Sequence, residues 1–170
     1  PGFINFYLKQ DWMYDMLAGI IAEGENYGNL VSDCKEKIQV EYVSANPTGP
    51  LHVGHGRGAA VGSALANLMK AAGMNVSREY YINDAGNQIN NLAASVNARY
   101  LEQLGQTVEF PENGYHGHDI IETAERIVRI YGDRFLNMSE EERLKEFRTI
   151  ALKEKLAALK EDLEAFNVTY

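Results

Sequence analysis

The most restrictive feature of the sequence is a strand–loop–helix–strand succession within residues 38–82. Residues 38–43 alternate with period two and are rich in branched side chains, which predicts a strand. Apolar side chains recur at helical spacing over residues 53–69, and residues 76–82 have the composition of a second strand. Strands joined by such a helix are parallel, and the connection is right-handed. The sequence therefore predicts an α/β fold built on a parallel sheet.

Helical patterns flank this unit on both sides. One begins near Asp11, a second follows the turn at residues 83–86, and a third covers residues 120–131. A capping box at residues 139–142 predicts the start of a longer helix. Two short strands are also predicted, at residues 3–8 and from residue 168 onward.

Composition narrows the class of protein. The 170 residues carry a net charge of −8, which argues against a nucleic-acid-binding protein on charge alone. Residues 41–100, however, carry four basic and three acidic side chains, so the acidity belongs to the flanks. The single cysteine, Cys34, excludes an internal disulfide framework and is typical of a reducing compartment. No apolar stretch approaches the ~20 residues of a membrane span and no signal peptide is visible, so we expect a cytoplasmic protein without a membrane partner.

Residues 44–58, between the first strand and its helix, are the segment that carries chemistry. Loops at this end of a parallel strand bind ligands in open α/β sheets, and the helix start offers unpaired N–H groups to an anion. His52 and His55 lie one helical turn apart, so both imidazoles can face the same side. Gly54 leaves room for a flat group such as a base, and Gly56 keeps the start of the helix open. We predict nucleotidyl transfer, in which a carboxylate attacks the α-phosphate of ATP.

Other interpretations of the histidines stay open. A His-x-Gly-His sequence occurs by chance, and its place between a strand and a helix is what favours function. A two-histidine metal site lacks a third ligand in register, so no metal site is predicted. His116 and His118 lie in a predicted loop, where a surface or capping role is favoured over metal binding.

The loop and the second strand together resemble a known family. Residues 44–58 and the segment Arg78-Glu-Tyr-Tyr-Ile-Asn-Asp-Ala-Gly86 are similar to bacterial arginyl-tRNA synthetases, which are class I aminoacyl-tRNA synthetases. The resemblance is most specific over residues 38–100. It implies a Rossmann-like parallel sheet, incomplete here, with a helical insertion. The resemblance implies three parts. Residues 1–34 would be the end of an N-terminal add-on domain with a junction helix, and residues 35–105 the first half of the catalytic core. Residues 106–170 would be the helical insertion, truncated before the next core strand.

For ATP, the resemblance implies a catalytic role for both histidines. His52 and His55 would contact the phosphates and stabilise the transition state of adenylate formation. Gly54 would lie against the adenosine, and Gly56 would also contribute to the ATP site. ATP with Mg²⁺ is then a substrate, and no tightly bound cofactor is implied. Many family members carry a lysine near the position of Gly49, so one cation on the phosphate side is unaccounted for here.

For arginine, the family's Glu-x-x-Ser-x-Asn pattern matches Glu41, Ser44 and Asn46. A carboxylate at a strand end can pair with a guanidinium, while the serine and asparagine can orient the amino and carboxylate groups. Asp84 and Gln88 are further candidates for the same pocket. The competing interpretations are an exposed strand residue for Glu41 and a turn former for Asp84.

The resemblance implies the function of arginine–tRNA ligases, which activate L-arginine with ATP and transfer it to tRNA(Arg). The second class I signature loop and the helical domain that reads the anticodon are not in the sequence. We therefore expect a fragment that is inactive by itself, from a parent enzyme that is a monomer. Two alternatives stay open: another nucleotidyltransferase with the same histidine motif, and a non-catalytic nucleotide-binding module. Binding of arginine rather than another acid would favour the ligase.

Overall fold

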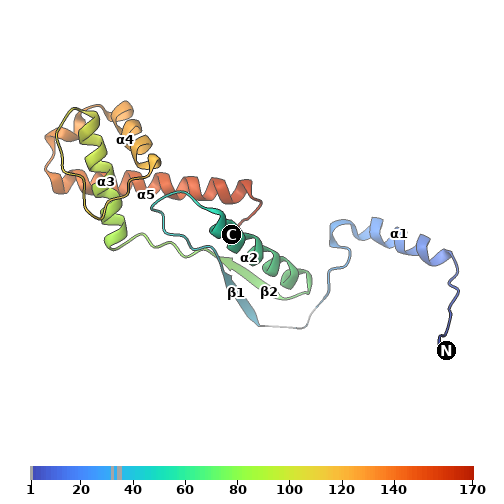
Figure 1. Ribbon diagram of the computed structural model, residues 1–170. Coiled ribbons are helices and arrows are strands. Elements are labelled where there is room, and N and C mark those ends of the chain that lie inside the picture. Colours follow the sequence, from blue (N-terminus) through green and yellow to red (C-terminus); the bar gives the residue numbers. More distant parts are fainter. Residues whose placement is uncertain (1, 32, 34–35) are drawn as a thin grey trace.

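The computed structural model describes residues 2–31, 33 and 36–170, so the expectation for Cys34 lies outside the described residues. Within these ranges the chain forms two strands, five α-helices and two short 3₁₀ helices (Figure 1). In chain order they are α1 (Asp11–Glu23), η1 (Gly24–Asn26), β1 (Lys37–Glu41), α2 (Val53–Ala71), β2 (Asn75–Glu79), α3 (Asn87–Gln103), α4 (His118–Tyr131), η2 (Arg134–Asn137) and α5 (Glu140–Ala165).

β1 and β2 form a two-stranded parallel sheet in which Glu41 lies opposite Glu79. α2 connects the strands and packs against both, which confirms the predicted strand–helix–strand crossover. Tyr42, just beyond β1, is buried beside Gly62 of α2. A Cβ added at Gly62 would lie 2.5 Å from the Tyr42 Cβ, so no side chain fits there. The glycine therefore lets α2 approach the end of β1 closely, and this contact sets the position of the helix.

α3, α4 and α5 form a helical cluster with its own core. Tyr100 of α3 and Phe147 of α5 are completely buried there, with ring centroids 4.9 Å apart. Phe135, from η2, packs edge-on against Phe147 at 5.1 Å. The Tyr100 hydroxyl donates to the Gly132 carbonyl, which satisfies its polar end. α3 falls within the predicted core segment 35–105 but packs with the later helices, and the boundary at residue 105 stays a prediction.

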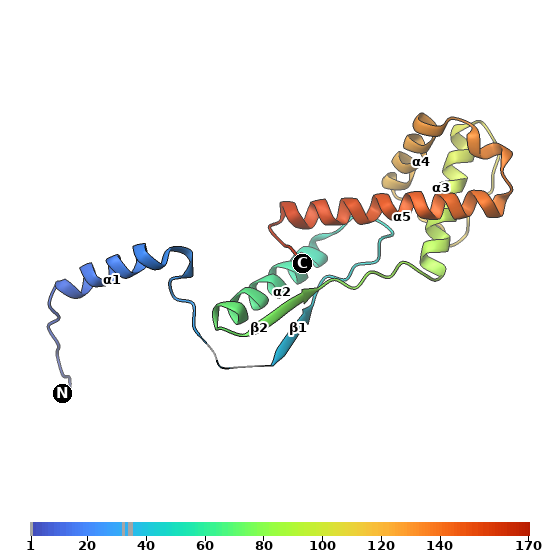
Figure 2. The ribbon, with the colours of Figure 1, turned by 180° about the vertical axis from the view of Figure 1, so that it is seen from behind.

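α5 is long enough to belong to both halves of the molecule. Its 26 residues extend over about 39 Å at 1.5 Å per residue. Phe147 and Ala151 in its first half belong to the core of the helical cluster. Leu163 near its end joins a second core with Tyr42 and Val168. Figure 2 shows the helix reaching from the cluster to a position beside α2 and the sheet.

Two predicted strands do not form within the described residues. Residues 3–8 adopt no strand and their large apolar side chains are exposed. A strand needs a neighbour to take its N–H and C=O groups, and no described residue pairs with this segment. Residues 168–170 likewise form no strand. β1 ends at Glu41, two residues earlier than predicted, because the backbone turns at Val43 with a positive φ.

The predicted helices are confirmed. The capping box at residues 139–142 starts α5, and α1 begins at Asp11 as expected. No residue of α1 is buried, and both views show this helix apart from the sheet and the helical cluster (Figures 1 and 2). Across the described ranges, no helix has both the length and the apolar character needed to cross a membrane.

Candidate functional site

Two histidines stand together at the start of α2. His52 precedes the helix, and its Nδ1 accepts a hydrogen bond from the Gly54 N–H at 3.1 Å. The His55 Nδ1 accepts in turn from the His52 N–H at 3.3 Å, so the two rings form a reciprocal cap. The rings stack with centroids 3.8 Å apart. A Cβ added at Gly54 would lie 2.9 Å from the His52 ring, so the glycine is what allows this arrangement.

The capping bonds decide which ring nitrogens remain available. Because both Nδ1 atoms accept from backbone N–H groups, each neutral ring carries its proton on Nε2. Burial lowers the pKa of His55, and the neighbouring His52 lowers it further, so His55 is neutral at pH 7. Each neutral ring can therefore donate one Nε2–H bond to an acceptor such as a phosphate oxygen. The N-terminus of α2 adds its partial positive charge at the same place.

Glu41 and Ser44 meet in a tight turn after β1. The Ser44 Oγ donates to the Glu41 Oε1 at 2.7 Å, so the only proton of this hydroxyl is already in use. Val43 and Ser44 have φ values of 66° and 42°, a left-handed region that a branched residue rarely adopts. Each such residue costs about 1–3 kcal/mol and persists only where its surroundings hold it. Asn46 follows the turn and is exposed.

Three consecutive residues at the carboxyl end of β2 hold this turn by hydrogen bonds. The Glu79 carbonyl accepts from the Tyr42 N–H at 3.3 Å. The Tyr80 hydroxyl donates to the Ala45 carbonyl at 2.8 Å. The Tyr81 N–H donates to the Ser44 Oγ at 3.0 Å. Burial raises the pKa of Tyr80, so its hydroxyl keeps the proton that it donates. We did not predict these residues from sequence. The one signal for them is the parallel pairing itself, which sets the ends of both strands side by side.

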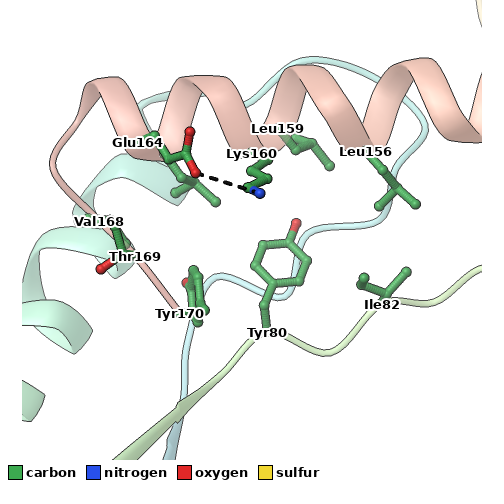
Figure 3. Close-up of a pocket in the computed structure, with 10 residues that line it drawn as sticks. Tyr80, Ile82, Leu156, Leu159, Lys160, Glu164, Val168, Thr169 and Tyr170 are labelled. Atoms are coloured by element: carbon green, nitrogen blue, oxygen red, sulfur yellow. Dashed lines mark ion pairs between the residues drawn. The ribbon is translucent and has the colours of Figure 1, made fainter.

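A cavity of about 560 Å³ lies beside the turn, between the end of β2, the second half of α5 and the last residues of the chain (Figure 3). The ring of Tyr80 forms part of its wall. Tyr170 lies next to it in an edge-on contact, with ring centroids 5.5 Å apart. The Tyr170 hydroxyl donates to the Tyr42 carbonyl at 2.9 Å. The wall of the cavity and the support of the turn therefore share the same side chains.

Asp84 and Gln88 lie in a different environment. The Asp84 carbonyl accepts from the Arg148 guanidinium of α5 at 3.0 Å, and both residues line a second cavity of about 440 Å³. Gln88 is exposed in the first turn of α3. No hydrogen bond among the described residues joins either of them to Glu41 or Ser44. Arg148 is a residue that sequence reasoning missed, since no pattern indicates a contact across 64 positions.

The second pair of histidines has contacts typical of a surface. His118 begins α4 with 80% of its side chain exposed, and its Nε2 lies 3.5 Å from a carboxylate oxygen of Glu122. His116 packs against the Phe110 ring with centroids 4.4 Å apart. In the part of the chain that the structure describes, no group of three or more potential ligands gathers to hold a metal ion.

Known proteins are similar to this chain in sequence and in fold. Residues 16–154 match the family model for the catalytic domain of class I (R) tRNA synthetases. Over all 170 residues, the chain is 58% identical to the arginine–tRNA ligase of Carboxydothermus hydrogenoformans and 54% identical to that of Bacillus subtilis. It spans 30% and 31% of the length of these relatives. A crystal structure of an arginyl-tRNA synthetase from Campylobacter jejuni aligns with a TM-score of 0.81 and 32% identity, over 95% of this chain and 35% of that one.

The family match places residues 16–154, which contain the parallel crossover and the paired histidines, in the catalytic domain of a class I tRNA synthetase. Within that class, the chain belongs to the arginyl-tRNA synthetase family, as the sequence resemblance implied. The predicted α/β, Rossmann-like fold is confirmed with it.

Proposed function

We propose that this chain provides the ATP-phosphate site and part of the arginine site of an arginine–tRNA ligase. The observation that carries the proposal is the stacked pair of His52 and His55 at the start of a helix that follows a parallel strand. Gly54, whose missing Cβ makes room for the His52 ring, would lie against the adenosine. An added Cβ at Gly56 would have no neighbour within 4 Å, so there is open space beside this turn for a phosphate chain.

In the first step, a carboxylate oxygen of L-arginine forms a bond to the α-phosphorus of ATP. The bond from this phosphorus to the bridging oxygen breaks, and pyrophosphate leaves with the electron pair. Negative charge shifts over the phosphate oxygens during this displacement. The Nε2–H groups of His52 and His55 would stabilise it, since the capping bonds occupy only the Nδ1 atoms. Mg²⁺ belongs to the ATP substrate and neutralises part of its charge. In the second step, a hydroxyl oxygen of the terminal adenosine of tRNA(Arg) forms a bond to the carbonyl carbon of the arginyl-adenylate. The bond from this carbon to the phosphate oxygen breaks, and AMP leaves with the electron pair.

The turn after β1 is the proposed arginine site. Ser44 orients the Glu41 carboxylate by its hydrogen bond to Oε1, and the carboxylate remains able to pair with a cationic group of arginine. Since the Ser44 proton is used on Glu41, the serine can offer the substrate only an acceptor. Asn46 lies exposed two residues on and can meet the amino or carboxylate group. Asp84 and Gln88 are proposed as the part of the pocket nearer to α5.

The test is ATP–pyrophosphate exchange by the complete gene product that contains this chain, measured with arginine and tRNA(Arg) present. His52→Ala and His55→Ala should each lower kcat by roughly 10²–10³-fold, the effect of removing one donor to a developing negative charge. His118→Ala is the matched control, because this histidine lies exposed at the start of α4 and should leave exchange unchanged.

Three results would contradict the proposal. The first is exchange that depends on another acid instead of arginine, which would indicate a different nucleotidyltransferase. The second is ATP binding without any exchange, which would indicate a binding module. The third is equal activity of the His52→Ala, His55→Ala and His118→Ala variants.

A further inference from the structure

We infer that Tyr80 is a positioning residue for arginine: its hydroxyl fixes the Ala45 carbonyl and thereby the turn that presents Ser44 and Asn46. The inference rests on the proposed arginine site. Tyr80 itself lies one residue beyond β2 and reaches the turn across 35 positions of sequence. It would act on the substrate only through the backbone that it holds.

The turn needs such support because its backbone is unfavourable. Val43 and Ser44 are consecutive residues with positive φ, and neither is a glycine. Within the turn, the Ser44 N–H donates to the Tyr42 carbonyl at 3.0 Å, a bond that joins residues only two positions apart. A conformation of this kind persists only where contacts from outside the segment over-determine it.

Tyr80 supplies one of two side-chain bonds in that support; the other is the bond from the Tyr170 hydroxyl to the Tyr42 carbonyl, at the opposite end of the turn from Asn46. The bonds from Glu79 and Tyr81 use backbone atoms, which any residue at these positions would offer. The Tyr80 bond, in contrast, depends on a phenol of the right length, at 2.8 Å from the Ala45 oxygen. The ring is half-buried against Tyr170, and Figure 3 shows the two rings next to each other below α5. Packing therefore fixes the ring, and the ring fixes the hydroxyl.

The position of the bond explains why it should matter for arginine and not for ATP. Ala45 lies between Ser44 and Asn46, so displacement of its carbonyl moves both candidate contacts. The histidine pair, by comparison, is held by its own capping bonds and by the contact of α2 at Gly62. Loss of the Tyr80 hydroxyl should therefore disturb one half of the site only.

The experiment compares Tyr80→Phe with the unmodified gene product and with Tyr131→Phe. Both substitutions remove one hydroxyl and keep the ring, and no hydrogen bond of the Tyr131 hydroxyl is found among the described residues. Tyr80→Phe should raise the KM for arginine roughly three- to tenfold, the effect of one lost hydrogen bond, and leave the KM for ATP unchanged. Exchange of the Tyr81 amide with solvent deuterium should also become faster, because its acceptor, the Ser44 Oγ, is then less firmly placed.

A purely structural role for Tyr80 would give a different result. It would reduce the fraction of active enzyme, which lowers the apparent kcat and leaves both KM values in place. That result, an unchanged KM for arginine, or an equal effect of Tyr131→Phe would overturn the inference. If the unmodified protein shows no arginine-dependent exchange, the proposed function fails, and amide exchange alone decides: faster exchange of Tyr81 supports the hold on the turn, and unchanged exchange overturns it.

Discussion

Gly62→Ala tests whether the close approach of α2 to the end of β1 holds the site together. The added Cβ would lie 2.5 Å from the Tyr42 Cβ, whereas carbon atoms pack at about 3.5–4.0 Å. The helix must therefore move away by at least about 1 Å, or the buried tyrosine must leave its place. Overpacking of this kind costs about 1–3 kcal/mol.

The matched control is Gly58→Ala, one turn earlier in α2. An added Cβ at Gly58 meets no atom within 4 Å, so this variant gains only the helix propensity of alanine, up to about 1 kcal/mol. Gly62→Ala gains the same propensity and bears the overpacking in addition. In urea unfolding, Gly62→Ala should therefore be less stable than Gly58→Ala by about 1–3 kcal/mol.

The same displacement should affect activity, because the two proposed catalytic residues, His52 and His55, lie at the start of α2. A misplacement of about 1 Å at a catalytic group can lower the rate by about 10²-fold. We expect Gly62→Ala to lose arginine-dependent exchange to that extent, and Gly58→Ala to keep it. Equal stability of the two variants would refute the reasoning, since it would show that the sheet and α2 are not held at the distance that only a glycine allows.

Three further predictions address other parts of the molecule. Burial holds the pKa of His55 below its usual 6.5, so the unfolded chain takes up the proton first as the pH falls. The free energy of unfolding should therefore decrease below about pH 6.5. Urea unfolding at pH 7 and at pH 5 should show a smaller decrease for His55→Gln than for the unmodified protein. Phe147→Ala should lower the free energy of unfolding by about 3–5 kcal/mol because the ring is fully buried, whereas Phe166→Ala at an exposed position should change it by less than about 0.5 kcal/mol; similar losses for both would contradict the assignment of the core. Arg148→Ala removes the bond to the Asp84 carbonyl and should raise the KM for arginine roughly two- to tenfold with the KM for ATP unchanged; an unchanged KM for arginine would separate Asp84 from the arginine pocket.

Local patterns predicted the elements that depend on neighbouring residues. The capping box at residues 139–142 and the apolar spacing after residue 53 place α5 and α2 correctly, because helix bonds join residues four positions apart. The strand predicted at residues 3–8 failed for the opposite reason. Its side chains fit a strand, but a strand forms only with a partner, and composition says nothing about whether a partner is present.

The candidate site, too, has one part that local sequence predicts and one part that it does not. The pairing of His52 with His55 follows from their spacing, and the structure adds the two Nδ1 bonds that leave each Nε2–H for a ligand. The hydrogen bond between Glu41 and Ser44 was not foreseen, because it depends on positive φ values at Val43 and Ser44, which neither valine nor serine favours.

The parallel crossover, the histidine pair at its helix start and the family of the chain could all be predicted from the sequence alone. These depend on periodicity and on short, contiguous motifs. Three features required the folded molecule: how the turn after β1 is held, which side chain just beyond β2 reaches it, and how α5 joins the helical cluster to the sheet. The bonds concerned connect positions 35, 37 and 64 residues apart, so they exist only after the crossover has closed and α5 has packed against it.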